Sequence, residues 1–176
     1  MSIAFLYCSY AERNHQTIEQ LLGSLIQQLL RQSVIPENIV ELYNLHKYSN
    51  TQPDLAELST HLRSVASSFA KVYIVVDALD ECDETDKTRS SLLIQLRSLE
   101  KHVQLFFTSR PLGEVECICD AAQFRIRAQE DDMRKYLSTK IQQERRLSEL
   151  CTKNEGLEEE ILDKIVAKSD GMLVHI

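Results

Sequence analysis

Short apolar runs alternate along this chain with longer segments in which apolar residues recur every three or four positions. The short runs have the length of buried strands, and the periodic segments are typical of amphipathic helices. Four strands are predicted, the last of them short: Ile3 to Tyr7, Val72 to Val76, Val103 to Thr108 and Phe124 to Ile126. Strands that alternate with helices predict an α/β fold with a parallel sheet and right-handed crossovers.

The helix that follows the first strand has the clearest signal. Its apolar stripe runs from Ile18 to Leu30, and Thr17-x-x-Gln20 has the form of a capping box. Pro36 is expected to open a short helix that ends near Leu45, and Pro53 to start another. Further amphipathic helices are predicted over 92–99, 130–144 and 157–166, with Asp170-Gly171 ending the last one.

Composition narrows the class of protein. The 176 residues suffice for a buried core, and a net charge of −7 argues against a nucleic-acid surface. No stretch approaches the roughly 18 apolar residues that span a bilayer, and no secretory leader is visible. We therefore expect a cytoplasmic protein that binds neither nucleic acid nor membrane.

Cysteine and histidine give no sign of a metal or nucleophile site. The five cysteines are odd in number and irregularly spaced, so neither a disulfide framework nor a zinc site is indicated, and reduced thiols are expected. Cys82 is expected to serve as a small packing residue. The five histidines are scattered and are expected on helix faces or the surface.

The candidate chemistry lies in the acids that follow the central strand. Asp77, Asp80, Glu81 and Asp83 come directly after Val72 to Val76. Ligands of open parallel sheets bind outside the carboxyl ends of the strands, where carboxylates can hold Mg²⁺ and polarise a water. The alternatives are a solvated strand-end acid at Asp77 and helix N-terminal acids at Asp80 and Glu81. Asp83 is expected to cap a helix.

Three motifs give the chain a family resemblance. The strand that ends in Asp77-Ala-Leu-Asp-Glu81 resembles the extended Walker B motif of NACHT-type signal-transducing P-loop NTPases. Gln104 to Pro111 resembles their sensor strand, which ends in Thr-Ser-Arg-Pro. Ile3 to Tyr10 and the helix after it resemble the segment that follows the phosphate-loop helix. The resemblance extends to nephrocystin-like N-terminal domains that precede ankyrin repeats, and it covers nearly the whole chain.

This resemblance implies a role for each candidate residue. Asp77 would hold Mg²⁺, usually through water, and Asp80 and Glu81 would be the catalytic or water-orienting acids. Arg110 would sense the γ-phosphate, for which a planar cation is suited. Without nucleotide, Arg110 is expected to pair with one of these acids. Thr108 and Ser109 are expected mainly to cap the turn, with hydrogen bonds to the acids as the alternative.

The phosphate-gripping half of the family's site is missing from the sequence. A phosphate loop needs Gly-x-x-x-x-Gly-Lys-Ser/Thr, and none of the four glycines is followed by Lys. The family places this loop before the first strand, so we expect a fragment that starts just after it. The family's phosphate-loop strand lies between the strands matched by Val103 to Phe107 and Phe124 to Ile126.

The expected architecture is therefore a partial P-loop NTPase three-layer sandwich. It would hold three well-formed parallel strands with the fourth weakly attached, followed by C-terminal helices. Residues 1–128 are expected to form a truncated NACHT nucleotide-binding core, and residues 129–176 the start of the next helical subdomain.

Three functions remain open at this point. The first is a fragment of an oligomerisation switch whose complete domain binds ATP or GTP with Mg²⁺. The chain alone would then be inactive and hold neither ligand. The second is a non-catalytic interaction or scaffold module that binds itself or other proteins. The third and weakest is an unrelated α/β signalling fold, suggested only by the opening Phe5 to Tyr10.

Overall fold

The computed structural model describes residues 1–110, 122–124 and 126–169. The chain divides into two compact units, Met1–Cys119 and Asp120–Ile176. The first unit holds the sheet and the candidate site, and the second is helical. The predicted boundary near residue 128, with the identity of the part on each side, stays a prediction.

A three-stranded parallel sheet forms the centre of the first unit. Its strands are β1 (Ser2–Tyr7), β2 (Val72–Asp77) and β3 (Val103–Phe107), in the order β1-β2-β3. Val76 of the central strand lies opposite Leu6 on one side and Phe107 on the other. All three carboxyl ends therefore meet at one edge of the sheet. The α/β class and the three predicted parallel strands are confirmed.

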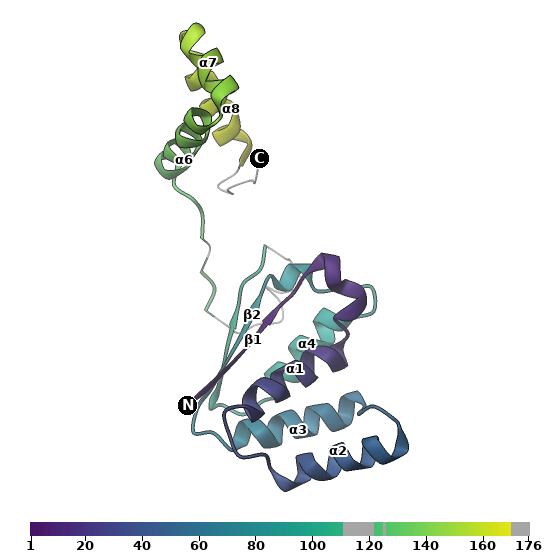
Figure 1. Cartoon of the computed structure of the whole chain (residues 1–176). Helices are drawn as coiled ribbons and strands as arrows, with labels where there is room; N and C mark the ends of the chain where they lie inside the picture. Colours follow the sequence, from purple (N-terminus) through teal and green to yellow (C-terminus); the bar gives the residue numbers. More distant parts are fainter. Residues whose placement is uncertain (111–121, 125, 170–176) are drawn as a thin grey trace. The chain divides into compact units, whose positions relative to one another are not determined.

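Helices cover one face of this sheet (Figure 1). They are α1 (Ile18–Leu30), α3 (Leu55–Ser67) and α4 (Thr88–Arg97), with α2 (Glu37–Ser49) beside α3. Leu22, Leu25 and Leu62 of α1 and α3 pack with Ile74 of β2 into one core cluster. The capping box of Thr17 and Gln20 at the start of α1 is present as predicted.

The other face of the sheet carries exposed apolar side chains. Ile3, Phe5 and Tyr7 alternate with buried residues along β1 and are 55%, 48% and 65% exposed, and Phe106 of β3 is 60% exposed. Among the residues described in this unit, the sheet and its helices make two layers. The third layer of the expected sandwich is not found within them.

The outer edge of β1 is closed by glutamine side chains. Phe5 donates its N–H to Gln28 Oε1 at 2.9 Å and accepts from Gln28 Nε2 at 2.8 Å, as it would from a neighbouring strand. The same pairing recurs between Gln32 and Ile3, and Gln16 bonds Tyr7 and Ser9. These amides satisfy backbone groups that an open edge would offer to another chain.

Several helix limits differ from the sequence expectation. Helix α2 continues to Ser49 and ends where Asn50 adopts a left-handed conformation, φ 52°. Helix α3 starts at Leu55, because Asp54 caps it in a capping box with Glu57. Helix α4 starts four residues before Leu92 and ends at Arg97. The polar segment after β1 forms a short 3₁₀ helix, η1 (Tyr10–His15).

The second unit consists of α6 (Glu130–Gln143), α7 (Arg145–Lys153) and α8 (Leu157–Ser169). Leu137, Ile141 and Leu162 form its small core. Arg134 of α6 is paired with Glu130 and with two acids of α8, Glu159 and Asp163. No helix in the described part of the chain is long and apolar enough to cross a membrane.

The short strand predicted at Phe124 to Ile126 is not found. Phe124 and Ile126 have no regular secondary structure and are 85% and 93% exposed, and Arg125 lies outside the described residues. Among the described residues no strand pairs with Phe124 or Ile126 and covers their side chains, so the alternation in sequence did not suffice to form a strand. The predicted helix end at Asp170-Gly171 also lies outside the described residues.

Candidate functional site

The segments after β2 and β3 run side by side and bring the candidate residues together. Thr108 donates its N–H to Val76 O at 3.0 Å, and its own carbonyl accepts from Leu79 N–H at 2.9 Å. These bonds extend the pairing of the two strands beyond their ends. Asp77 and Arg110 consequently lie at the same end of the sheet, as the sequence predicted from the parallel order.

Thr108 fixes the carboxylate of Asp77. Its hydroxyl donates to Asp77 Oδ1 and accepts from the N–H of Ala78 at 2.9 Å. Ala78 is held at φ 53°, a left-handed conformation that residues with a Cβ rarely adopt. The hydroxyl thus bridges an acid and a strained turn, so the hydrogen bond to the acid, given above as the alternative to capping, is present. Ser109 instead donates to Arg110 O at 2.7 Å.

Arg110 contacts Asp80 with both its backbone and its side chain. The Arg110 N–H donates to Asp80 Oδ1 at 3.0 Å, and Nε lies 3.5 Å from Oδ2. The Asp80 side chain is 12% exposed, whereas that of Arg110 is 73% exposed. The predicted pairing of Arg110 with one of the acids is confirmed, and Asp80 is the acid concerned.

Asp80 and Glu81 face different strands although they are adjacent in sequence. They belong to the 3₁₀ turn η2 (Leu79–Glu81), in which successive side chains point about a third of a turn apart. Asp80 bonds the segment after β3, and Glu81 Oε2 accepts from the N–H of Tyr10, after β1, at 3.2 Å. The turn therefore ties all three strand ends together.

Asp83 does not cap helix α4, contrary to the sequence expectation. Its Oδ1 accepts from the N–H of Thr85 at 2.8 Å, and this hydrogen bonding lowers the pKa of Asp83. Asp86 lies closer to the helix start, and its Oδ1 accepts from Thr88 N–H at 3.0 Å. In the same turn Ser90 N–H donates to Glu84 Oε2 at 3.1 Å and Arg89 N–H to the backbone carbonyl of Asp83 at 3.0 Å. The exposed amides at the helix start are therefore shared among several groups of the preceding loop.

Two buried thiols meet beside the site. Cys8 follows β1, Cys82 follows η2, and both side chains belong to the same buried core cluster. The interaction with Cys82 lowers the pKa of Cys8, and the interaction with Cys8 together with burial raises the pKa of Cys82. Sequence reasoning gave Cys82 only a packing role. The missed signal was that both cysteines follow neighbouring parallel strands at the same end.

The side chains at this end of the sheet limit how a metal ion could be bound there. No group of three or more His, Cys, Asp or Glu in the described residues could enclose a metal ion. Mg²⁺ commonly uses one or two carboxylates and takes its other ligands from water and substrate phosphates. Asp77, half-buried and oriented by Thr108, fits that use as a single carboxylate.

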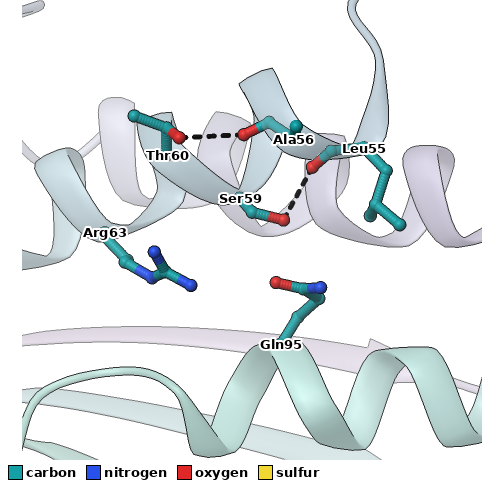
Figure 2. Close-up of a pocket in the computed structure, with 6 residues that line it drawn as sticks. All are labelled: Leu55, Ala56, Ser59, Thr60, Arg63 and Gln95. Carbon is teal, nitrogen blue, oxygen red and sulfur yellow. Dashed lines mark hydrogen bonds between the residues drawn. The ribbon is translucent and has the colours of Figure 1, made fainter.

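A hollow of about 430 Å³ lies elsewhere, between α3 and α4 (Figure 2). Within α3, the hydroxyls of Ser59 and Thr60 donate to Leu55 O at 2.6 Å and Ala56 O at 2.9 Å. Arg63 at its rim donates to Ser98 Oγ at 3.0 Å. None of the strand-end acids lines this hollow, so we do not place the candidate chemistry there.

The fold and the site define an α/β protein with a partial P-loop-like sheet and polar side chains at its carboxyl edge. Residues 1–110 match the family model described as "Nephrocystin 3, N-terminal". This match covers more than half of the chain, from β1 through Arg110, and the chain therefore belongs to that family. No curated protein and no solved structure gave a match.

Proposed function

We propose that this chain is part of a NACHT-type signal-transducing P-loop NTPase. The complete domain would bind ATP or GTP with Mg²⁺ and use the nucleotide to control oligomerisation. The observation that carries the proposal is the contact of Arg110 with Asp80, next to the Thr108–Asp77 bond, across the ends of two parallel strands. That is where a sensor Arg and a magnesium acid of such a domain belong.

Each residue has a role in this proposal. Asp77 holds Mg²⁺ through water, with its carboxylate oriented by Thr108. Asp80 and Glu81 orient the attacking water. Arg110 keeps Asp80 as its partner until a γ-phosphate is present. Its side chain is 73% exposed, so moving the guanidinium to phosphate breaks only a weak ion pair.

The two edges of the sheet support the same assignment. Val72 N–H donates to His102 O, and Thr108 N–H donates to Val76 O. The backbone N–H and C=O groups of the even-numbered residues in β3 therefore point toward β2. The backbone groups of Leu105 and Phe107 point the other way, where no described residue bonds them. Glutamine side chains close the outer edge of β1. The outer edge of β3 is the one beside which NACHT-type domains have their phosphate-loop strand.

The chain itself is proposed to lack activity and to bind nucleotide poorly. Its sequence has no Gly-x-x-x-x-Gly-Lys-Ser/Thr to cradle phosphates. We expect no saturable ATP binding in the micromolar range by calorimetry. Residues 1–128 would be the truncated nucleotide-binding core and residues 129–176 the start of the next helical subdomain. A cytoplasmic location, with nucleotide or protein partners rather than nucleic acid, completes the proposal.

The second candidate is a non-catalytic interaction module. The exposed apolar face of the sheet favours it, because Ile3, Phe5, Tyr7 and Phe106 form one side of two edge strands. Large exposed apolar patches are typical of surfaces that contact another protein. In this case the strand-end acids would be structural, and removing them would change stability without changing any ligand affinity.

A fusion tests the first candidate against the second. A strand, a Gly-x-x-x-x-Gly-Lys-Ser loop and a helix are joined ahead of Met1. Protection of the Leu105 amide from hydrogen exchange then reports that the added strand has docked on β3. We expect Mg²⁺-dependent ATP binding by calorimetry, which Asp77→Asn abolishes and the control Asp132→Asn, on α6, leaves unchanged. A docked strand without such binding, or equal binding in the Asp77→Asn form, would contradict the proposal.

A further inference from the structure

The thiol pair of Cys8 and Cys82 has features that simple core packing does not require. Both side chains are buried, 5% and 3% exposed, they belong to one core cluster, and each shifts the pKa of the other. Cys8 comes directly after β1 and Cys82 directly after the turn η2. The pair therefore joins two segments that are far apart in sequence, at the end of the sheet where the acids lie.

Hydrogen bonds from two backbone N–H groups, one to a carbonyl and one to a carboxylate, tie these two segments together. Cys8 donates its N–H to Asp77 O at 3.0 Å. Tyr10 donates its N–H to Glu81 Oε2 at 3.2 Å, one residue before Cys82. A disulfide requires two Cα atoms within about 7 Å and side chains that face each other. Both thiols lie in one buried core cluster, and hydrogen bonds tie together the two segments that carry them. This arrangement favours both conditions.

The pair also lies close to the surface. Tyr7 and Tyr10, on either side of Cys8, are 65% and 64% exposed. Cys151, in the helical unit, is a half-buried free thiol with no such partner cysteine among the described residues.

We propose that Cys8 and Cys82 are an oxidation site that forms an intramolecular disulfide, with a low-molecular-weight disulfide such as oxidised glutathione as the oxidant. The site does not depend on nucleotide binding. Its formation would lock the end of β1 to the turn that carries Asp80 and Glu81.

The reaction proceeds by two thiol–disulfide exchanges. The thiolate of one cysteine attacks the oxidant, breaks its S–S bond, forms a mixed disulfide and releases one glutathione thiolate. The thiolate of the second cysteine then attacks the protein sulfur of that mixed disulfide and releases the second glutathione. Two S–H bonds of the protein are lost and two of glutathione are formed, so the protein is oxidised by two electrons and the glutathione disulfide is reduced by two.

Peptide mapping of the folded full chain tests this directly. The protein is equilibrated in glutathione buffers of increasing oxidised fraction, its remaining thiols are blocked, and it is digested with trypsin. Cleavage places Cys8 in peptide 1–13, Cys82 in 72–87 and Cys151 in 147–153. We expect a linked 1–13/72–87 species, two hydrogens lighter than its parts, at an oxidised fraction that leaves Cys151 a free thiol. Cys82→Ser should remove it.

Two results would overturn the proposal. In the first, Cys8 and Cys82 remain free thiols in buffers that already convert Cys151 to its glutathione adduct. In the second, the linked species forms only after the protein has been unfolded in urea. Thermal unfolding gives an independent readout: a disulfide that fits the native fold raises the Tm of the oxidised chain above that of the reduced chain. A lowered Tm would show that the native geometry does not accept the bond.

Discussion

Arg110 reaches Asp80 twice across the ends of β2 and β3, with its N–H 3.0 Å from Oδ1 and its Nε 3.5 Å from Oδ2. The two contacts differ in environment. The carboxylate is 12% exposed, whereas the guanidinium side chain is 73% exposed. The backbone contact therefore holds Asp80 in place even when the Arg110 side chain is elsewhere, which leaves that side chain available for a ligand.

This difference predicts unequal effects of truncating the two residues. Asp80→Ala removes the acceptor of both contacts and should lower the free energy of unfolding by about 1–2 kcal/mol, since a hydrogen bond to a charged group is lost. Arg110→Ala keeps the backbone contact and removes a solvent-exposed ion pair, so a loss below about 1 kcal/mol is expected. Urea unfolding measures both. An Arg110→Ala loss as large as that of Asp80→Ala would contradict the finding.

The hydroxyl of Thr108 predicts a second effect on stability. Thr108→Val keeps the shape of the side chain but leaves the Ala78 N–H and the Asp77 carboxylate without their partner. The free energy of unfolding is expected to fall by about 1–3 kcal/mol, because the Ala78 N–H in the strained turn then has no hydrogen-bond acceptor. Thr108→Ser keeps the hydroxyl and is the matched control, with a smaller loss. Equal losses in the two variants would show that the methyl group matters rather than the hydrogen bonds.

The glutamines along β1 predict a change in association. Replacing both Gln28 and Gln32 by Ala uncovers backbone groups of Ile3 and Phe5, whose side chains are already 55% and 48% exposed. An open, apolar strand edge is a template for pairing with another chain. Sedimentation velocity should therefore show more self-association than in the unmodified protein.

The control for this experiment is Gln27→Ala, an exposed position on α1 next to Gln28. It changes helix composition in the same way without touching β1. If the Gln28/Gln32 variant associates no more than the Gln27 variant, the side-chain amides do not protect the edge.

The strands, the first helix and the position of the candidate site could be predicted from the local pattern of apolar and polar residues. The apolar runs located three strands, and the rule that parallel strands present their carboxyl ends together placed Asp77 and Arg110 at one edge of the sheet. The apolar stripe and capping box gave α1 to within about two residues. These features depend on residues that are close in sequence or on one general rule of topology.

The features that sequence reasoning missed depend on contacts between distant positions. The bonds from Gln28 and Gln32 to β1, and the meeting of Cys8 with Cys82, need the packed fold before they exist. Helix α7 was missed because it is short, although Leu147 and Cys151 on one of its faces pack against the small core of the second unit. Helix α2 has no buried residue, which explains why its end at Ser49 was placed too early.

Paramagnetic broadening tests the central claim most directly, because it detects a weak metal–phosphate site on the chain as it is. Mn²⁺ replaces Mg²⁺, ATP is present at millimolar concentration, and amide resonances are followed by NMR. We predict that the amides of Asp77, Ala78, Thr108 and Arg110 broaden more than those of the acidic run 158–160 on α8, and that Asp77→Asn removes the difference. Broadening that is no stronger at the strand ends than on α8, or that persists in the Asp77→Asn variant, would contradict the account.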